Sequence, residues 1–311
     1  MVFSFSVKGS LTLLIFILVV FLTFVFLGLT YRQTIYAATD SQQTEIARED
    51  KGPSKPKGEL LLAGLELFSF IFLVAALILT VYNIGNIGPG VLNVVFISFF
   101  FGVLFLGLTR VFIFLTDQGF YQITDETLHL WWHVIFYLGM ISFIWGGYRL
   151  KQISTAEHPS GFNNSDKIFF GLLSLAVVGI FLVANPFEST LAKILEESVI
   201  ASLGLHHFLA FILASVAAWY IYYIKNNWGN LLSVGAVPIL VFLSLMGLQH
   251  FWELVTESWK LISIPESTIE QVEQLIIIPA YLLLIFAMLK TAKIIQGQTK
   301  AANANSTNNA A

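Results

Sequence analysis

Histidine and glutamate residues recur at helical spacing within the apolar part of the sequence. Glu126, His129 and His133 stand at i, i+3 and i+7, and His250 and Glu253 form an i, i+3 pair. Residues at these spacings lie on one face of a helix. Imidazole and carboxylate groups bind iron, copper and zinc, and Glu-x-x-His pairs on bundle helices are the ligands of di-iron and di-manganese proteins. The spacing therefore favours a metal or haem site inside a helical bundle.

Other apolar segments contribute ionisable residues that we expect at a similar depth in a membrane. A rise of 1.5 Å per residue places them roughly 6 to 12 Å from the extracytoplasmic end of each segment. An ionisable group in hydrocarbon costs a few kcal/mol and is rarely left facing lipid. Groups at one depth are therefore expected to face a common interior. The residues of this polar layer, besides those named above, are Glu66, Arg110, His206, His207, Glu273 and Gln274, and Glu270 lies one turn before Glu273 and Gln274 on the same helix face.

We predict a metal centre in the extracytoplasmic third of the bundle, with His133, His207 and His250 as its core ligands. Adjacent residues on a helix point about 100° apart, so only one of His206 and His207 is expected to face the interior. Glu126 and His129 lie nearer the outer water boundary. The further expected ligands or proton acceptors are Glu66, Glu126, His129, His206, Glu253, Glu270 and Glu273.

A b-type haem is an alternative occupant of the same layer. It needs two histidines on facing helices, which His133 with His207 or His250 would supply, and Arg110 would then balance a haem propionate. The many carboxylates near the histidines favour a non-haem metal. Zinc would activate water for hydrolysis, whereas iron or copper would carry out oxidation and reduction. The predicted function is therefore a membrane metalloenzyme, either an oxidoreductase or a hydrolase.

Two other classes of protein are compatible with a layer of polar residues. An ion- or proton-coupled transporter would use the histidines and carboxylates as a relay, but the inner half of the helices is almost purely apolar. In a structural subunit of a membrane complex, the histidines would serve assembly rather than bind metal. A structural role is also open for single residues: Glu66 and Arg110 would form a structural ion pair, and the residues solvated at the outer boundary would be Glu253, Glu257, Glu266 and Glu270.

The composition identifies an integral membrane protein. The chain has 311 residues, of which 57% are hydrophobic and only 11% are charged, too apolar for a soluble globule. It contains no cysteine, which excludes disulfides, thiolate ligands and iron–sulfur clusters. The net charge of −3 gives no basis for nucleic-acid binding. The expected partners are the lipid bilayer, other membrane subunits or a small apolar substrate.

The apolar segments predict an all-α, polytopic transmembrane helix bundle. Residues 1–31 form a signal peptide or signal-anchor helix, and residues 32–58 an extracytoplasmic linker. Residues 59–295 hold seven mature helices, and residues 296–311, rich in Asn and Ala, are predicted to be a disordered cytoplasmic tail. The seven segments are placed at about 60–83, 91–115, 127–149, 167–185, 198–224, 232–256 and 269–293.

The distribution of basic residues orients the bundle in a cell membrane. Lysine and arginine concentrate in alternate loops, among them Arg149, Lys151, Lys225 and Lys290. Cytoplasmic loops carry such an excess. The C-terminus is therefore expected in the cytoplasm, and the histidine layer on the opposite side of the membrane.

Overall fold

A computed structural model of the protein describes residues 57–87, 90–117, 125–155, 161–183, 204–227 and 229–308. These ranges are almost entirely helical and contain no strand. The predicted signal sequence and nearly all of the predicted linker lie outside them. Within these ranges the elements are α2 (Lys57–Asn86), α3 (Val91–Asp117), α4 (Asp125–Thr155), α5 (Asn164–Val183), α8 (Leu205–Asn227), α9 (Gly229–Glu253), the π-helix η1 (Leu254–Ser258) and α10 (Glu266–Asn308).

Each of the seven predicted apolar segments overlaps one of these α-helices. In the described part of the chain, five helices are long and apolar enough to cross a membrane, namely α2, α3, α8, α9 and α10. The stretches concerned are Leu67–Asn86, Leu92–Phe112, Leu205–Lys225, Gly235–Ser258 and Thr268–Gly297. The bundle is thus of the multi-pass membrane type, as predicted.

The two remaining helices, α4 and α5, have more interrupted apolar surfaces. Trp131, Trp132 and His133 interrupt α4 close to its start, and α5 opens on polar and charged residues that include Asp166 and Lys167. Such residues lower the mean hydropathy of a helix. The total of seven membrane spans therefore remains a prediction.

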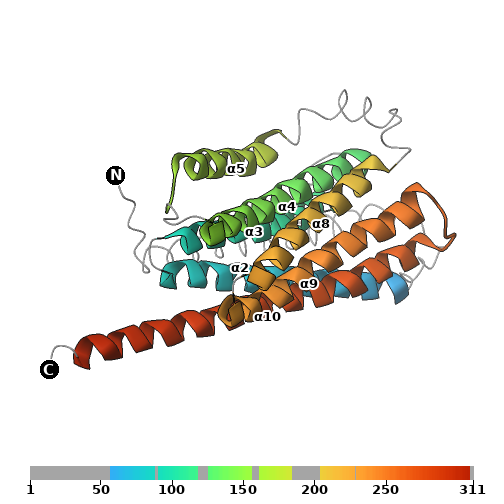
Figure 1. Ribbon diagram of the computed structural model, residues 1–311. Coiled ribbons are helices and arrows are strands. Elements are labelled where there is room, and N and C mark those ends of the chain that lie inside the picture. Colours follow the sequence, from blue (N-terminus) through green and yellow to red (C-terminus); the bar gives the residue numbers. More distant parts are fainter. Residues whose placement is uncertain are drawn as a thin grey trace, which may run out of the picture.

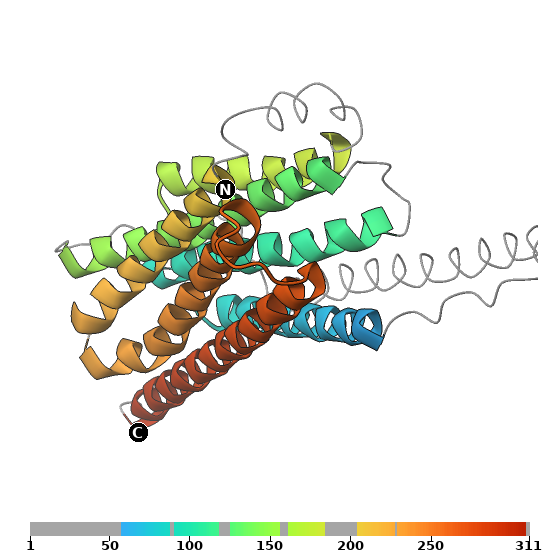
Figure 2. The same cartoon turned by 90° about the vertical axis from the view of Figure 1, so that its right-hand side faces the viewer.

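Six helices pack side by side in a closed circuit. Along it, α2 packs on α3, α3 on α4, α4 on α8, α8 on α9, α9 on α10, and α10 again on α2. Figures 1 and 2 show these helices running roughly alongside one another, with α5 on the outside of the bundle, and α5 contacts α3. The circuit encloses an interior lined by large apolar side chains, among them Phe136, Met140, Phe143, Phe242 and Tyr281, all 2% exposed or less.

Small residues allow the helices of the circuit to approach closely. A Cβ at Gly147 of α4 would lie 2.6 Å from the Cβ of Tyr220 on α8, and one at Gly102 of α3 would lie 2.6 Å from the Phe143 ring. Because lipid is as apolar as the helix surfaces, packing of this kind rather than the hydrophobic effect holds membrane helices together. The glycines therefore fix the distance between neighbouring helices.

A buried ion pair fixes the start of α5 to the end of α4. The Arg149 guanidinium lies 3.1 Å from Asp166 Oδ2 and donates a hydrogen bond of 2.8 Å to the Gly161 carbonyl. Asp166 Oδ1 also accepts a hydrogen bond of 3.1 Å from Trp145 Nε1. The Arg149 and Asp166 side chains are 4% and 0% exposed. Charges so buried are stable only when they are paired and hydrogen-bonded.

The C-terminal region departs from the sequence-based expectation of a disordered tail from residue 296. Instead, α10 continues as a helix to Asn308 and projects beyond the bundle in Figure 1. Ala301, Ala302 and Ala304 favour helix, and extending an existing helix avoids the cost of nucleating a new one. Asn-rich composition alone therefore underestimates helix continuation here.

We expect Asp166→Ala to lower the free energy of unfolding by about 3 kcal/mol, because it leaves the buried Arg149 charge without its partner. Reversible unfolding in mixed detergent micelles, followed by circular dichroism, measures this change. Lys167→Ala, at the exposed next position, is the matched control and should stay within about 0.5 kcal/mol of the wild type. Equal effects of the two variants would contradict the structural role of the ion pair.

Candidate metal centre

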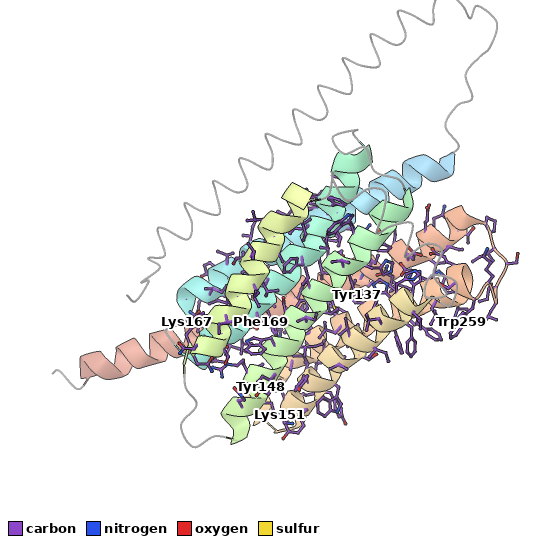
Figure 3. The ribbon with its side chains drawn as sticks, turned by 90° about the horizontal axis from the view of Figure 1, so that it is seen from above. Tyr137, Tyr148, Lys151, Lys167, Phe169 and Trp259 are labelled. Carbon is purple, nitrogen blue, oxygen red and sulfur yellow. The ribbon has the colours of Figure 1, made fainter. Side chains whose placement is uncertain are left out.

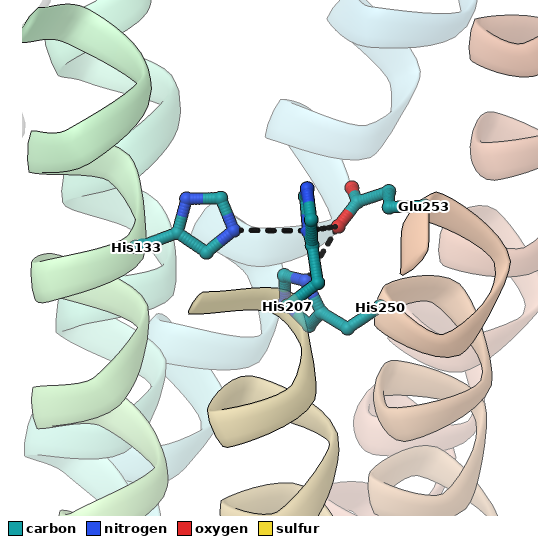
Figure 4. A group of neighbouring side chains, drawn as sticks. All are labelled: His133, His207, His250 and Glu253. Atoms are coloured by element: carbon teal, nitrogen blue, oxygen red, sulfur yellow. Dashed lines mark hydrogen bonds and ion pairs between the residues drawn. The ribbon is translucent and has the colours of Figure 1, made fainter. Parts of the chain in front are cut away.

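Three helices bring their histidines together at one end of the bundle. His133 lies early in α4, His207 in the first turn of α8, and His250 and Glu253 in the last turn of α9. Because α4 and α8 begin where α9 ends, all four side chains reach the same level. Figure 4 shows His133 pointing across the interior toward His207, with Glu253 on the far side of the His207 ring.

Four ligand atoms converge in this interior. His133 Nε2 lies 3.1 Å from His207 Nδ1, and His207 Nδ1 lies 2.9 Å from Glu253 Oε2. The same carboxylate oxygen lies 2.6 Å from His250 Nδ1. One ligand atom from each of the four residues lies within 4.8 Å of all the others. None of the four residues is more than 1% exposed.

The nitrogen atom His207 Nδ1 cannot satisfy both of its short contacts as ordinary hydrogen bonds. If it carries a proton that it donates to Glu253, it has no lone pair to accept a hydrogen bond from His133. If it accepts from His133 Nε2 instead, its lone pair is used and its contact with the Glu253 carboxylate has no proton. Several lone pairs thus converge on one point, as they do around a bound cation.

Three of the separations between these atoms lie close to those around a first-row transition-metal ion, and all of them lie within 4.8 Å. Metal–nitrogen distances near 2.0–2.1 Å place neighbouring ligands of a tetrahedral ion about 3.3 Å apart. The observed separations are 2.6, 2.9 and 3.1 Å. To match a tetrahedral ion, each would need to increase by an amount between about 0.2 and about 0.7 Å. Three imidazole nitrogens and one carboxylate oxygen form a donor set that suits zinc, iron and copper.

Two polar side chains orient the candidate ligands. Gln249 Nε2 donates a hydrogen bond of 2.7 Å to Glu253 Oε1, which leaves Oε2 directed at the histidines. Glu257 Oε2 lies 3.7 Å from His207 Nε2, the ring nitrogen that does not face the cluster. A carboxylate in this position favours the tautomer with its proton on Nε2 and its lone pair on Nδ1, which is the form that binds metal.

Aromatic side chains enclose the cluster on the α4 side. The ring centroid of Phe136 lies 4.1 Å from that of His250, and the Trp132 ring lies 5.2 Å from His133. The Tyr137 hydroxyl donates a hydrogen bond of 2.8 Å to the His206 carbonyl, which ties α4 to the first turn of α8. These rings exclude water, so charges within the cluster interact more strongly than they would at a surface.

The backbone at the start of α8 fits tightly against η1. Gly204 has a φ of +65°, a conformation that is costly for other residues. A Cβ there would also lie 2.5 Å from Ser258 Cβ and 2.7 Å from Leu254 Cδ1. In η1 the Trp259 N–H donates to the Leu254 carbonyl at 2.9 Å, which is the i→i+5 pattern of π-helices that often occur at functional sites. Gly204 thereby sets the distance between His207 and Glu253.

Of the predicted site residues, His133, His207, His250 and Glu253 form the compact cluster. His206 lies beside it, with its ring centroid 4.7 Å from that of His133. Arg110, Glu270 and Glu273 belong to α3 and α10 and are not among the four converging ligands. The side chains of Glu66, Glu126 and His129 lie outside the described residues, so their predicted roles stay predictions.

The sequence-based prediction of the site did not include three residues that shape the cluster, namely Gln249, Glu257 and Gly204. Gln249, Glu253 and Glu257 stand at i, i+4 and i+8, a spacing that indicates one polar face and that would have selected Gln249. Glu257 was instead interpreted as a solvated boundary residue. Gly204 precedes the two histidines directly, but its role depends on contacts with η1 that the sequence does not reveal.

The contacts between the histidines do not favour haem. Two axial ligands of a haem iron lie on opposite sides of the ring, with their nitrogens about 4 Å apart, twice a metal–nitrogen distance. His133 Nε2 and His207 Nδ1 are 3.1 Å apart, and the Phe136 ring packs against His250. The cluster has the dimensions of a single-ion site.

Comparisons of the chain with protein-family models, with curated proteins and with solved structures give no match.

We expect Gly204→Ala to weaken metal binding at least about tenfold, because the added methyl group would push α8 away from η1 and separate His207 from Glu253. Competition with a metal chelator, followed by elemental analysis, measures this change. Gly171→Ala is the matched control, since nothing lies within 4 Å of a Cβ at that position. If both variants retain the affinity of the wild type, the close fit at Gly204 does not position the cluster.

Gln249→Leu should weaken metal binding by about tenfold to a hundredfold, since it removes the hydrogen bond that orients the Glu253 carboxylate. The same chelator titration measures the effect. Ser244→Ala on the same helix is the control, because the Ser244 hydroxyl is exposed and bonds only to its own helix at Leu240. Wild-type affinity in the Gln249 variant would show that Glu253 needs no such support.

Proposed function

We propose that the protein is an integral membrane metalloenzyme that binds one transition-metal ion through His133, His207, His250 and Glu253. The observation that carries this proposal is the convergence of three imidazole nitrogens and one carboxylate oxygen within 4.8 Å, in a helical bundle of membrane type. Intramembrane ionisable groups are costly and are usually retained for function. A purely structural polar contact would need neither three histidines nor a shared carboxylate oxygen.

The residues of the centre have distinct roles in this proposal. The three histidines bind the ion as neutral ligands, and Glu253 Oε2 supplies the negative charge that offsets part of the charge of the ion. Gln249 and Glu257 hold Glu253 and His207 in place. When bound, zinc would activate water for hydrolysis, whereas iron or copper would support oxidation and reduction. The identity of the metal therefore decides between a hydrolase and an oxidoreductase.

The finer topology belongs to the same proposal. We infer seven membrane spans in the mature protein, preceded by a signal peptide or signal anchor, with the C-terminus in the cytoplasm of a cell-membrane protein. The centre then lies in the extracytoplasmic third. Figure 3 supports this arrangement, since Trp259 lies at one end of the bundle and Lys151 and Lys167 lie toward the other. Tryptophan at one boundary and lysine at the cytoplasmic one agree with the usual distribution.

The enclosure of the cluster favours an enzyme over a transporter or a structural subunit. In a transporter, the polar residues would continue across the bilayer as a relay. Further along the interior of the described bundle, away from the histidines, the space between the helices is filled by apolar side chains. Phe143, Phe242 and Leu284 are each fully buried there. In a structural subunit the histidines would be needed for assembly, and removing them would not alter metal content.

Metal analysis of the purified protein tests this proposal. We expect about one equivalent of zinc, iron or copper per chain, and its loss in each of the variants His133→Ala, His207→Ala and His250→Ala. Inductively coupled plasma mass spectrometry gives the stoichiometry, and the visible absorption spectrum reports a haem if one is present.

His206→Ala is the control for this experiment, because its ring lies beside the cluster without belonging to the four converging ligands. It should keep its metal. A wild-type protein that remains metal-free after incubation with each of the three ions would refute the proposal, and a Soret band lost in the His133 and His207 variants would favour haem instead.

A further inference from the structure

A second polar group lies at the same end of the bundle, between α3 and α10. Arg110 lies about two turns before the end of α3, and Glu273 about two turns after the start of α10. The Arg110 guanidinium interacts with the hydroxyl of Tyr281, which lies about two turns beyond Glu273 on α10. The neighbouring residue Gln274 accepts a hydrogen bond of 2.9 Å from the Ser69 hydroxyl of α2. Three helices of the circuit thus contribute to this group.

Two atoms of the group are buried without a hydrogen-bond partner. Within the described residues, Arg110 Nε and Glu273 Oε1 are both inaccessible to solvent and unpaired, and Glu273 is only 9% exposed. A buried polar atom left unpaired costs about 1–3 kcal/mol, and more when the group is charged. Such atoms in a native protein call for an explanation.

The Arg110 and Glu273 side chains do not satisfy each other. Arg110 and Glu273 lie within electrostatic range, yet in the described ranges they form no ion pair within 4.0 Å. Glu273 also experiences the charges of Glu253 and Glu257, so it lies near the proposed metal centre. Arg110 Nε on α3 and Glu273 Oε1 on α10 therefore lie beside that centre without bonding to each other. Each of these two atoms lacks a hydrogen-bond partner.

The chemistry of these two atoms defines what would bind between them. Arg110 Nε–H requires an acceptor, and Glu273 Oε1 requires a donor. The carboxylates of Glu253, Glu257 and Glu270 near Glu273 disfavour an anion. An alkylammonium group would lack the acceptor that Arg110 needs. A neutral amide or hydroxyl group supplies both an acceptor oxygen and a donor hydrogen.

The surroundings indicate that the rest of such a ligand is apolar. Phe112, two residues after Arg110, and Tyr281, which interacts with Arg110, are 1% and 2% exposed. Leu275, two residues after Glu273, is 65% exposed on a helix that is apolar enough to cross a membrane. The face of α10 opposite Glu273 therefore borders lipid at the level of the polar group, and a hydrocarbon chain there would remain in an apolar environment.

We propose that Arg110 and Glu273 bind the neutral amide or hydroxyl head of a lipid-like substrate beside the metal centre. This inference rests on the proposed function, because it supplies the substrate class for that same centre. Arg110 donates to the carbonyl or hydroxyl oxygen, and Glu273 accepts from the amide N–H or the hydroxyl O–H. The hydrocarbon chain extends along the bundle toward lipid.

The test uses full-length, metal-loaded protein in detergent micelles and tritiated oleamide as the probe. Saturable binding is expected in a scintillation proximity assay. Unlabelled oleyl alcohol should compete effectively, whereas methyl oleate, which has no donor, and oleylamine, which has no acceptor when protonated, should compete at least about tenfold less well, equivalent to about 1.4 kcal/mol.

Variants test the two residues directly. Arg110→Gln and Glu273→Gln should each weaken oleamide binding at least about tenfold, while Glu270→Gln, one turn away on α10, should change it less than about threefold. The metal content of every sample is measured in parallel and should equal that of the wild type. This also shows that the variants are folded, because the metal ligands come from three helices.

The results separate the two proposals. If metal is bound but oleamide does not bind saturably, or if all four compounds bind equally well through their hydrocarbon chains, the substrate-binding inference is wrong and the metal centre stands. If the wild-type protein binds no metal, the proposed function fails regardless of the oleamide result. Wild-type oleamide affinity in both glutamine variants would likewise overturn the assignment of Arg110 and Glu273.

Discussion

The shared carboxylate oxygen of Glu253 is the interaction on which the end of the bundle depends. A carboxylate inside a membrane protein is stable only when hydrogen bonds or cations compensate for the water it has lost. Glu253 has such partners, since Gln249 donates a hydrogen bond to one oxygen and His207 and His250 contact the other. The closed circuit of helices allows this, because it brings α8 and α9 side by side and positions α4 opposite them. Without that circuit, the charge would face lipid.

Two of the buried polar clusters in the described part of the chain compensate a buried carboxylate in different ways. Arg149 and Asp166 neutralise each other directly and tie α4 to α5. At the other end of the bundle, histidines rather than an arginine surround the carboxylate of Glu253. Histidine can donate a proton, accept one or bind a metal, whereas arginine stays protonated. The first arrangement is therefore suited to stability, and the second to chemistry.

The sequence was sufficient to predict the helical architecture and most of the cluster, because both depend on local patterns. Long apolar runs have to be helices in a membrane, and the i, i+3 spacing of His250 and Glu253 predicted a shared face that the structure contains. The partners Gln249, Glu257 and Gly204 depend on how α8 meets η1, which no periodicity encodes. The first described turn of α8 begins at Leu205, so His207 lies nearer its helix start than the estimated segment from 198 implied. The helical residues 296–308 were missed because composition does not report the helix that precedes them.

The order of the histidine-bearing helices along the chain also bears on how the protein is made. The chain enters the membrane from its N-terminus, so α4 and α8 are in place before α9 delivers His250 and Glu253. Until then, His133 and His207 have no carboxylate partner, and the metal-binding set is incomplete. In the proposed metalloenzyme, an ion would bind the assembled form and not the partly inserted one, so it would stabilise the last step of assembly by mass action. If the metal centre is as proposed, metal supply during insertion would thus raise the fraction of chains that complete assembly.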